Sequence, residues 1–188
     1  MKEPEIMKGP TVVWKRGRAE VSRKRLRFQD GNEEDWYFWG GRNNPSVVFA
    51  VTEDGKVIAG RQWRGGSACP VLELFGGHPE HGQSQEEAAR RELAEEAGYE
   101  AGEIIKLPNF WIEPTSIETI IVPFLARGCH PLAAQKPEAG EMIEIVEIPL
   151  NEWLRMAFTE ERDGCFKDSK TLAITLLALP HLGLKFSV

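Results

Sequence analysis

Three glutamates in one short acidic segment have the type and spacing that could hold a metal ion. Glu92, Glu95 and Glu96 lie between two glycines, Gly77 and Gly98. On a helix, which turns about 100° per residue, Glu92 and Glu96 lie at the edge of the buried face and Glu95 lies further toward solvent. Such carboxylates repel one another unless a positive charge sits among them, and hard cations such as Mg²⁺ or Mn²⁺ prefer oxygen ligands. The alternative is a charged, solvated helix face, the common explanation for a Glu- and Arg-rich helix taken alone.

Local chemistry delimits the helix that carries these acids. Ser84 is followed three residues later by Glu87, the pattern of a capping box in which both side chains bind backbone N–H groups at a helix start. The helix is therefore predicted to begin near Gln85 and to end at Gly98, where the left-handed conformation carries no steric penalty. Small or apolar residues at every fourth position predict its buried face: Ala89, Leu93 and Ala97.

The full spacing of residues 77 to 99 resembles the Nudix box, which combines a glycine, a glutamate and an Arg-Glu-hydrophobic-any-Glu-Glu-any-Gly-hydrophobic run at fixed distances. Gln83 stands where the box has its first glutamate. In the family that residue supports the box arginine, so we expect the Gln83 amide to accept a hydrogen bond from Arg91 and the site to stay active. The other box positions are all matched, by Gly77, Arg91, Glu92, Leu93, Glu95, Glu96, Gly98 and Tyr99.

This resemblance implies an enzyme that splits a pyrophosphate with the help of divalent cations. The barrier of that reaction is mostly electrostatic, so cations that bridge the phosphates and lower the pKa of a bound water supply much of the catalysis. By resemblance, Glu92, Glu95 and Glu96 hold Mg²⁺ (or Mn²⁺), and the carbonyl oxygen of Gly76 is a further ligand. Arg91 and Glu95 are also counted among the catalytic residues.

A general base is expected on a separate loop that faces the reacting water. In the ADP-ribose group of the family this base is a glutamate on the flexible loop before a late strand, which implies Glu138, Glu141 or Glu144 here. Glu144 alternates with isoleucines inside a predicted strand and is expected to be fixed. Glu141 is therefore the first candidate and Glu138 the second, and the alternative for each is a solvated loop acid.

A proline beyond the box narrows the substrate. Family members that act on ADP-ribose and related nucleotide sugars carry a proline about sixteen residues after the last box glycine, and Pro114 has that place. Segments 62–64 and 72–77 also resemble elements of ADP-ribose pyrophosphatases, and residues 168–173 resemble the start of their final helix. Phe75-Gly76 departs from the usual Pro-Ala, and the usual Gly-Phe after the proline is absent. The resemblance implies a nucleotide-sugar substrate without choosing between ADP-ribose, a GDP- or UDP-sugar and a dinucleotide.

Tryptophan is abundant, with six residues in a chain of 188. Trp14, Trp36, Trp39 and Trp111 lie in or near segments expected to frame a cleft, where stacking on a nucleotide base contributes about 1–3 kcal/mol. For each one alone, a core or interface position is the more common role. The residues predicted to bind substrate are Arg64, Trp39, Trp111 and Glu118.

The order of apolar and turn segments predicts an α/β chain. It fits the Nudix α/β/α sandwich with a small N-terminal β-sheet appendage, which we place at residues 1–45, before a hydrolase domain at residues 46–188. In the ADP-ribose group such a sheet commonly joins two chains, so the resemblance implies a homodimer. Strands are predicted at 11–14, 19–28, 36–39, 47–51, 56–62, 103–107, 119–125 and 143–148, and further helices at 151–158 and 172–179.

Composition excludes several classes of protein. The net charge of −6 argues against general binding to nucleic acid, which needs a basic stripe. The basic run at residues 23–27 is the local exception, and it predicts either a charged hairpin or interface or a contact with an anionic ligand. No apolar run reaches the roughly 18 residues of a membrane span, so a soluble, cytoplasmic protein without a membrane partner is expected. The three cysteines, Cys69, Cys129 and Cys165, are widely spaced and are interpreted as ordinary thiols.

Two functions from different classes fit the motifs. The first is a hydrolase that splits ADP-ribose into AMP and ribose 5-phosphate, or acts on a related nucleoside diphosphate sugar. The second is a Nudix-fold sensor that binds such a ligand without cleaving it. Sensors of that kind usually lose the Arg-Glu and Glu-Glu pairs of the box and gain a DNA-binding domain. Because this chain keeps both pairs, hydrolysis is the prediction.

Overall fold

The computed structural model describes residues 2–17, 19–40, 44–132, 142–159 and 168–184, which form two compact units. The first unit comprises Met1–Asn44 and Trp111–Ile120, and the second comprises Pro45–Phe110 and Ile121–Val188. The sequence predicts a division at residue 45 but carries no sign that residues 111–120 group with the N-terminal strands.

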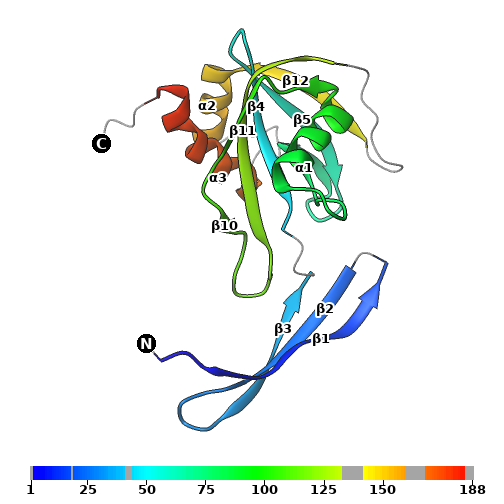
Figure 1. Cartoon of the computed structure of the whole chain (residues 1–188), viewed down its shortest axis with the longest axis vertical. Coiled ribbons are helices and arrows are strands. Elements are labelled where there is room, and N and C mark those ends of the chain that lie inside the picture. Colours follow the sequence, from blue (N-terminus) through cyan, green and yellow to red (C-terminus); the bar gives the residue numbers. More distant parts are fainter. Residues whose placement is uncertain (1, 18, 41–43, 133–141, 160–167, 185–188) are drawn as a thin grey trace. The chain divides into compact units, whose positions relative to one another are not determined.

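The first unit is built on an antiparallel sheet of order β1-β2-β3 (Figure 1). Its strands are β1 (Glu5–Arg16), β2 (Ala19–Arg27) and β3 (Glu33–Trp39). The strands predicted at 11–14 and 36–39 are longer in the structure. The antiparallel pairing of β1 with β2 changes register before, at and after Gly9-Pro10. Gly31, with φ of 85°, supplies the left-handed backbone of the β2–β3 turn.

The basic run on β2 is paired with acids of β3. Arg23 Nη1 lies 3.1 Å from Asp35 Oδ2, and Arg25 Nε and Arg27 Nη2 lie 3.0 and 2.8 Å from the Glu33 carboxylate. These pairs join residues that face each other or are diagonal neighbours across the two strands. Of the two predicted interpretations, the structure therefore supports the charged hairpin.

The second unit contains a nine-stranded sheet whose main path is β10-β11-β4-β5-β12. Strand β11 runs parallel to β4, and β4 runs antiparallel to β5. The short strands β6, β7, β8 and β9 pair at the sides of this path with β5, β4 or β11. The strands are β4 (Ser46–Thr52), β5 (Lys56–Arg64), β6 (Cys69–Glu73), β7 (Phe75–Gly77), β8 (Tyr99–Glu100), β9 (Glu103–Lys106), β10 (Phe110–Trp111), β11 (Ile120–Pro131) and β12 (Ile143–Pro149).

The helix of the Nudix box covers one face of this sheet. Helix α1 (Gln85–Glu92) begins where the capping box predicts, and it continues as a π-helical turn, η1 (Leu93–Ala97). The turn ends at Gly98, whose φ of 73° is left-handed, as predicted. The predicted stripe of Ala89, Leu93 and Ala97 is buried, and it belongs to one core cluster with Val48 and Ala50 of β4.

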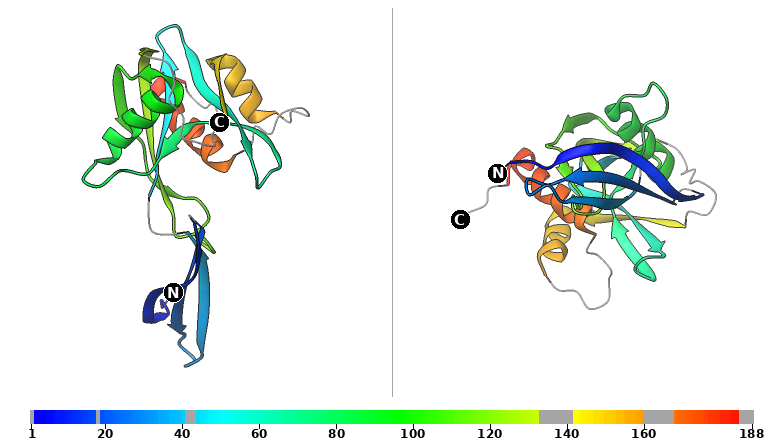
Figure 2. Two further views of the ribbon diagram at one scale, coloured as in Figure 1. Left: turned by 90° about the vertical axis from the view of Figure 1, so that its right-hand side faces the viewer. Right: turned by 90° about the horizontal axis from the view of Figure 1, so that it is seen from below.

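The opposite face of the sheet is covered by α2 (Leu150–Phe158) and α3 (Ser169–Ala178), which is followed by the 3₁₀ helix η2 (Leu179–Leu182). Phe49 of β4 meets Trp153 of α2 edge to face, with ring centroids 6.0 Å apart. The indole N–H of this fully buried tryptophan donates to Thr175 Oγ1 of α3 at 3.0 Å. Figure 2 shows the second unit from two further sides, with α1 on one side of the strands and α2 and α3 on the other. The predicted α/β/α sandwich is confirmed.

Two sequence predictions need correction. The prediction lacks strands β6 and β7. In the structure β6 pairs with β5 as an antiparallel hairpin from Gly60↔Glu73 to Arg64↔Cys69, and β7 pairs antiparallel with β4. The interpretation of the cysteines as ordinary thiols is wrong for Cys69, which is disulfide-bonded. Cys129 is a free thiol whose pKa burial raises to about 11, and Cys165 lies outside the described residues. Among the described residues, no helix is long and apolar enough to cross a membrane.

Candidate active site

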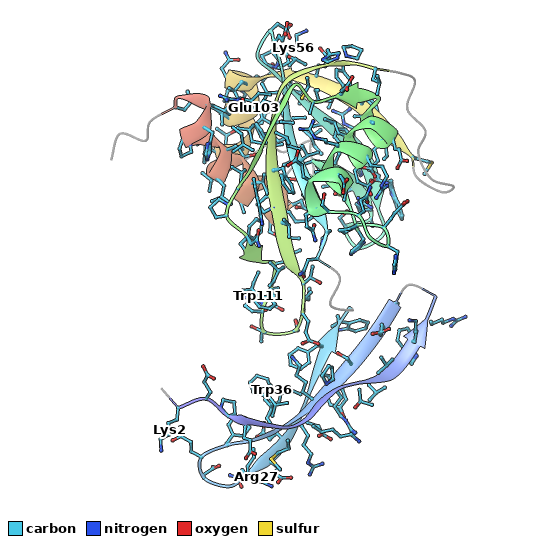
Figure 3. All side chains as sticks on the ribbon, viewed as in Figure 1. Lys2, Arg27, Trp36, Lys56, Glu103 and Trp111 are labelled. Carbon is cyan, nitrogen blue, oxygen red and sulfur yellow. The ribbon has the colours of Figure 1, made fainter. Side chains whose placement is uncertain are left out.

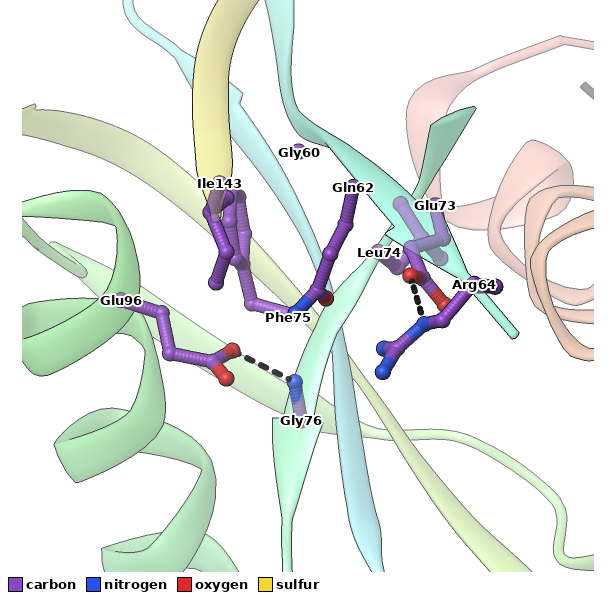
Figure 4. Close-up of a pocket in the computed structure, with 9 residues that line it drawn as sticks. All are labelled: Gly60, Gln62, Arg64, Glu73, Leu74, Phe75, Gly76, Glu96 and Ile143. Atoms are coloured by element: carbon purple, nitrogen blue, oxygen red, sulfur yellow. Dashed lines mark hydrogen bonds and ion pairs between the residues drawn. The ribbon is translucent and has the colours of Figure 1, made fainter. Parts of the chain in front are cut away.

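Two glycines of β7 lie against two of the box carboxylates. The backbone N–H of Gly76 donates to Glu96 Oε2 at 3.2 Å (Figure 4). A Cβ atom built on Gly77 would lie 2.0 Å from Glu92 Oε1, so the carboxylate of Glu92 is packed directly on that backbone. At Gly76 a Cβ atom would lie 2.4 Å from the carbonyl oxygen of Ser46 on β4. At Gly76 the backbone of β4 therefore leaves no room for a Cβ atom, and at Gly77 the missing side chain lets the Glu92 carboxylate lie on the strand. Strand β7 thus contacts both Glu92 and Glu96.

The π-helical turn follows Glu92 and carries Glu95 and Glu96. A π turn inserts one extra residue into the helical spiral, and such turns are frequent at functional sites. Here it lies within the acidic cluster, so it helps to determine where the second and third acids point.

Arg91 ties the box loop to the acids. Its Nη2 lies 2.8 Å from Glu92 Oε1 and donates to the carbonyl oxygen of His78 at 3.0 Å, while its Nη1 lies 2.8 Å from Glu95 Oε2. Its Nε donates to Gln83 Oε1 at 3.4 Å, which confirms that the amide accepts from this arginine as expected. Burial lowers the pKa of Arg91, but the hydrogen bond to Glu95 and the charge of Glu92 outweigh it, and the pKa is raised overall. The guanidinium therefore stays charged and links the loop to both acids.

The donor set at this place fits a divalent cation bound by few protein ligands. Among the described residues, no three His, Cys, Asp or Glu side chains converge as metal ligands. Glu95 is half exposed and is turned to Arg91, whereas Glu92 and Glu96 both face the β7 glycines. Mg²⁺ commonly binds through one or two carboxylates together with waters and substrate phosphates, so the Glu92 and Glu96 carboxylates are a sufficient set of hard oxygen donors. The roles of Gly76, Glu92, Glu95 and Glu96 as metal ligands stay predictions.

A pocket lies beside these groups and contains Arg64. The guanidinium Nε of Arg64 donates to Glu73 Oε1 at 2.6 Å, and Figure 4 shows this pair across the pocket from Glu96. The structure therefore brings the predicted substrate-binding Arg64 and the predicted metal ligand Glu96 into one cavity. Its polar and apolar lining comes from β5, β6, β7, η1 and β12, and includes Gln62, Arg64, Glu73, Gly76, Glu96 and Ile143.

Sequence analysis did not single out Glu73. The signal that could have found it is its place between Val71-Leu72 and Leu74, because a carboxylate inside an apolar strand requires a cationic partner.

The other predicted substrate-binding residues belong to the first unit. Trp39 and Trp111 are 58% and 53% exposed, and Trp111 is labelled in Figure 3. The N–H of Trp39 donates to the carbonyl oxygen of Ser116 at 2.7 Å, which ties β3 to the segment that follows Pro114.

Glu118 of the same segment forms contacts inside the first unit. Its carboxylate accepts from Ser22 Oγ at 3.3 Å and forms an ion pair with Lys24. Both charged side chains are largely buried, with 11% of Glu118 and 16% of Lys24 exposed. This pair anchors the segment to β2, and the role of Glu118 in substrate binding stays a prediction.

Of the candidate bases, only Glu144 is described. It lies on β12, as predicted, with its carboxylate 3.5 Å from Arg61 Nη1 of β5 and 64% of its side chain exposed. Glu138 and Glu141 lie outside the described residues, so their roles as catalytic bases stay predictions.

Several known proteins resemble this chain in sequence or in fold. The chain is 32% identical over 116 residues to a protein named ADP-ribose pyrophosphatase from Bacillus subtilis, a match that covers 61% of this chain and 63% of that protein. It is 30% identical over 148 residues to a GDP-mannose pyrophosphatase from Yersinia pestis, covering 74% of this chain and 72% of that protein. A crystal structure of an ADP compounds hydrolase has the same fold, with a TM-score of 0.83 at 20% identity over 97% of this chain and 96% of the other. The model of the NUDIX domain matches residues 42–168, and the chain belongs to the Nudix family.

Proposed function

We propose that this protein hydrolyses the pyrophosphate bond of ADP-ribose or a related nucleoside diphosphate sugar in a Mg²⁺-dependent reaction. The products are a nucleoside monophosphate and a sugar phosphate. One observation carries the proposal: Glu92 and Glu96 meet at the β7 glycines beside a pocket that contains Arg64. The names of the relatives support the substrate class, and Nudix hydrolases generally use divalent metal ions.

The residues of this site divide the work of the reaction. Glu92 and Glu96, with the Gly76 carbonyl, would hold the cation, which neutralises phosphate charge and lowers the pKa of a bound water. Arg91 fixes the carboxylate of Glu92 and the box loop through its contacts to His78 and Gln83. Arg64 would bind a phosphate oxygen, because its guanidinium is half exposed in the pocket.

The chain's own contacts favour hydrolysis over ligand sensing. A sensor needs to bind the nucleotide sugar but has no need for a positioned set of carboxylates. Here Arg91 holds Glu92 and Glu95, and β7 contacts Glu92 and Glu96 at Gly77 and Gly76. The arrangement holds carboxylates that repel one another, and a bound cation would compensate this repulsion.

A substrate panel tests this proposal. ADP-ribose, GDP-mannose, a UDP-sugar and a dinucleotide are incubated with the protein and Mg²⁺, and product phosphate is measured after coupling to a phosphatase. Turnover of at least one nucleotide sugar that disappears with chelator and returns with Mg²⁺ is expected. Saturable binding of a nucleotide sugar, measured by calorimetry, without any turnover would support the sensor instead.

The proposed base on the loop before β12 has its own test. If Glu141 takes the proton from the attacking water, Glu141→Gln lowers kcat by about 10²–10⁴ and leaves KM nearly unchanged, because general-base help acts in the transition state. Glu138→Gln and Glu144→Gln are measured beside it. A large loss only in Glu138→Gln would move the base to that residue, and no loss in any of the three would require a base from the box.

We expect the first unit to contribute to substrate binding and to dimerisation. Trp39 and Trp111 offer exposed rings that could stack on the nucleotide base, and Trp111→Ala is expected to raise KM about tenfold. The sheet also exposes apolar side chains on β1 and β3, which supports a homodimer formed through this sheet. Light scattering coupled to size exclusion tests the assembly, and a monomer at micromolar concentration would refute it. The exposed apolar residues of these strands are Ile6, Met7, Val12, Val13, Trp14, Trp36, Tyr37 and Trp39.

A further inference from the structure

One carboxylate of the pocket has no part in the chemistry described so far. Glu73 is buried, with 7% of its side chain exposed, and its two oxygens face two cations from different parts of the chain. Arg64 Nε lies 2.6 Å from Oε1, and Lys170 Nζ lies 3.5 Å from Oε2. A buried carboxylate is retained only when such partners compensate its lost hydration.

The start of α3 is built to bring Lys170 to this carboxylate. Asp168 caps the helix by accepting from the backbone N–H groups of Lys170 at 2.7 Å and of Thr171 at 3.1 Å. The buried Thr171 hydroxyl accepts from the N–H of Leu74, the residue after Glu73, at 3.4 Å. The carboxylate of Asp168 also pairs with Lys170 Nζ. The helix end is therefore fixed beside β6, and the ammonium of Lys170 lies between two acids.

Arg64 and Lys170 differ in how they can meet a ligand. The Lys170 side chain is 22% exposed and its charge is shared by Glu73 and Asp168, whereas Arg64 is 51% exposed and lines the pocket. A guanidinium is planar and carries donors on several edges. A hydrogen bond at Nε fixes the plane of that group and therefore the direction of its terminal nitrogens. Figure 4 shows Glu73 bonded to the Nε edge of Arg64.

We propose that Glu73 is a positioning residue that orients Arg64 toward a phosphate oxygen of the nucleotide sugar, while Lys170 balances the second oxygen of Glu73. The proposal rests on the proposed function and assigns a task to the β6 acid and to the start of the C-terminal helix. Glu73 does not touch the substrate and acts through Arg64. Arg64 attracts the phosphate anion, and the buried Glu73 carboxylate fixes the orientation of the Arg64 guanidinium.

Steady-state kinetics test this task. Glu73→Gln keeps the size of the side chain but removes its charge, and it is expected to raise KM about tenfold with kcat within about threefold, because a binding contact is misdirected. Glu73→Asp keeps the charge, but its shorter chain fails to reach Nε, so it is also expected to raise KM about tenfold. It serves as the second variant if Glu73→Gln folds poorly. Glu103→Gln is the matched control, because it removes a carboxylate from an exposed arginine pair with Arg127. It is expected to leave KM unchanged.

A double-mutant cycle separates positioning from general support of the fold. In an Arg64→Lys background, Glu73→Gln is expected to raise KM by less than about twofold, because the group that it orients is already gone. If the two changes multiply instead, or if both Glu73 variants lower the melting temperature without altering KM, Glu73 acts independently of Arg64 and the proposal is overturned.

A spectroscopic measurement does not depend on turnover. In ¹⁵N-labelled protein the Nε–H signal of Arg64 is assigned by its loss in Arg64→Lys, and its exchange with water is expected to be at least about tenfold faster in Glu73→Gln. An unchanged signal would overturn the positioning role. If the exchange changes as expected but no nucleotide sugar is cleaved, the Glu73–Arg64 coupling stands and the proposed function fails.

Discussion

Adding a single methyl group at Gly77 tests whether Glu92 must lie where the structure places it. The new Cβ in Gly77→Ala would lie 2.0 Å from Glu92 Oε1 and 2.4 Å from its Cδ, whereas real Cβ contacts essentially never fall below 3.0 Å. The carboxylate must therefore move by at least the difference between 3.0 and 2.0 Å, which is about 1 Å. A misplacement of that size can lower catalysis by about a hundredfold.

The fold should tolerate this change. The backbone of Gly77 is not in the left-handed region, so alanine is compatible with it, and the clash involves only the far end of a side chain. The expected change in the free energy of unfolding is below about 1 kcal/mol. Gly76→Ala is expected to behave differently, because its Cβ would meet the backbone carbonyl of Ser46 at 2.4 Å and must separate β7 from β4.

The assay measures kcat at saturating nucleotide sugar over a Mg²⁺ titration, beside thermal melting followed by circular dichroism. Gly66→Ala is the control, because its Cβ has no neighbour within 4 Å and its φ is not left-handed. We expect Gly77→Ala to melt like the unaltered protein, to need more Mg²⁺ and to lose about a hundredfold in kcat. A folded Gly77→Ala protein with normal kcat and normal Mg²⁺ dependence would refute the role of Glu92 at this site.

Three further predictions concern the box. Glu96→Gln is expected to lower kcat at least about a hundredfold with folding intact, because a charged ligand beside Gly76 is lost; near-normal turnover would contradict the metal assignment. Gln83→Glu should leave kcat within about tenfold, because this position supports Arg91, and a gain of several hundredfold would mark glutamine as inactivating. Burial and the hydrogen bond to Glu147 raise the pKa of Tyr99 from 10.0 to about 12, so its contribution to stability is full below pH 10 and is lost as the pH rises toward 12. Between pH 10 and 12 the melting temperature of Tyr99→Phe should therefore fall less than that of the unaltered protein. Equal falls in the two proteins would show that ionisation of Tyr99 does not affect stability.

The helix and its acids could be predicted because their signals are local. The capping box, the four-residue spacing of the stripe and the final glycine all act within a few residues, and each is found as expected in the structure. The π-helical turn could not be foreseen, because Leu93–Ala97 has the composition of an ordinary helix. The close approach of Gly77 to Glu92 depends on the pairing of β7 with β4, which the sequence did not reveal.

The contacts around the pocket could not be predicted because they join distant segments. Leu74 and Thr171 are 97 residues apart, and the Lys24–Glu118 pair spans 94 residues. Sequence patterns report which face of an element is buried, but they do not tell which buried acid will meet which cation. For this reason the sequence singled out Arg64 and overlooked Glu73, and it assigned Glu118 to the substrate without its partner on β2.

The contacts of Arg91 explain why the site can keep a glutamine at the first acid of the box. The guanidinium already lies beside Glu92 and Glu95 and donates to the His78 carbonyl, so the Gln83 amide is one of several acceptors and the charge of Arg91 is balanced without it. The same contacts have a consequence for the metal, since a cation at Glu92 would bind a carboxylate whose Oε1 already accepts from Arg91. Glu96 Oε2 accepts from the Gly76 amide. Removal of Arg91 would therefore release the loop at His78 while it strengthens the negative field at Glu92, so metal affinity and the position of the loop oppose each other at this one residue.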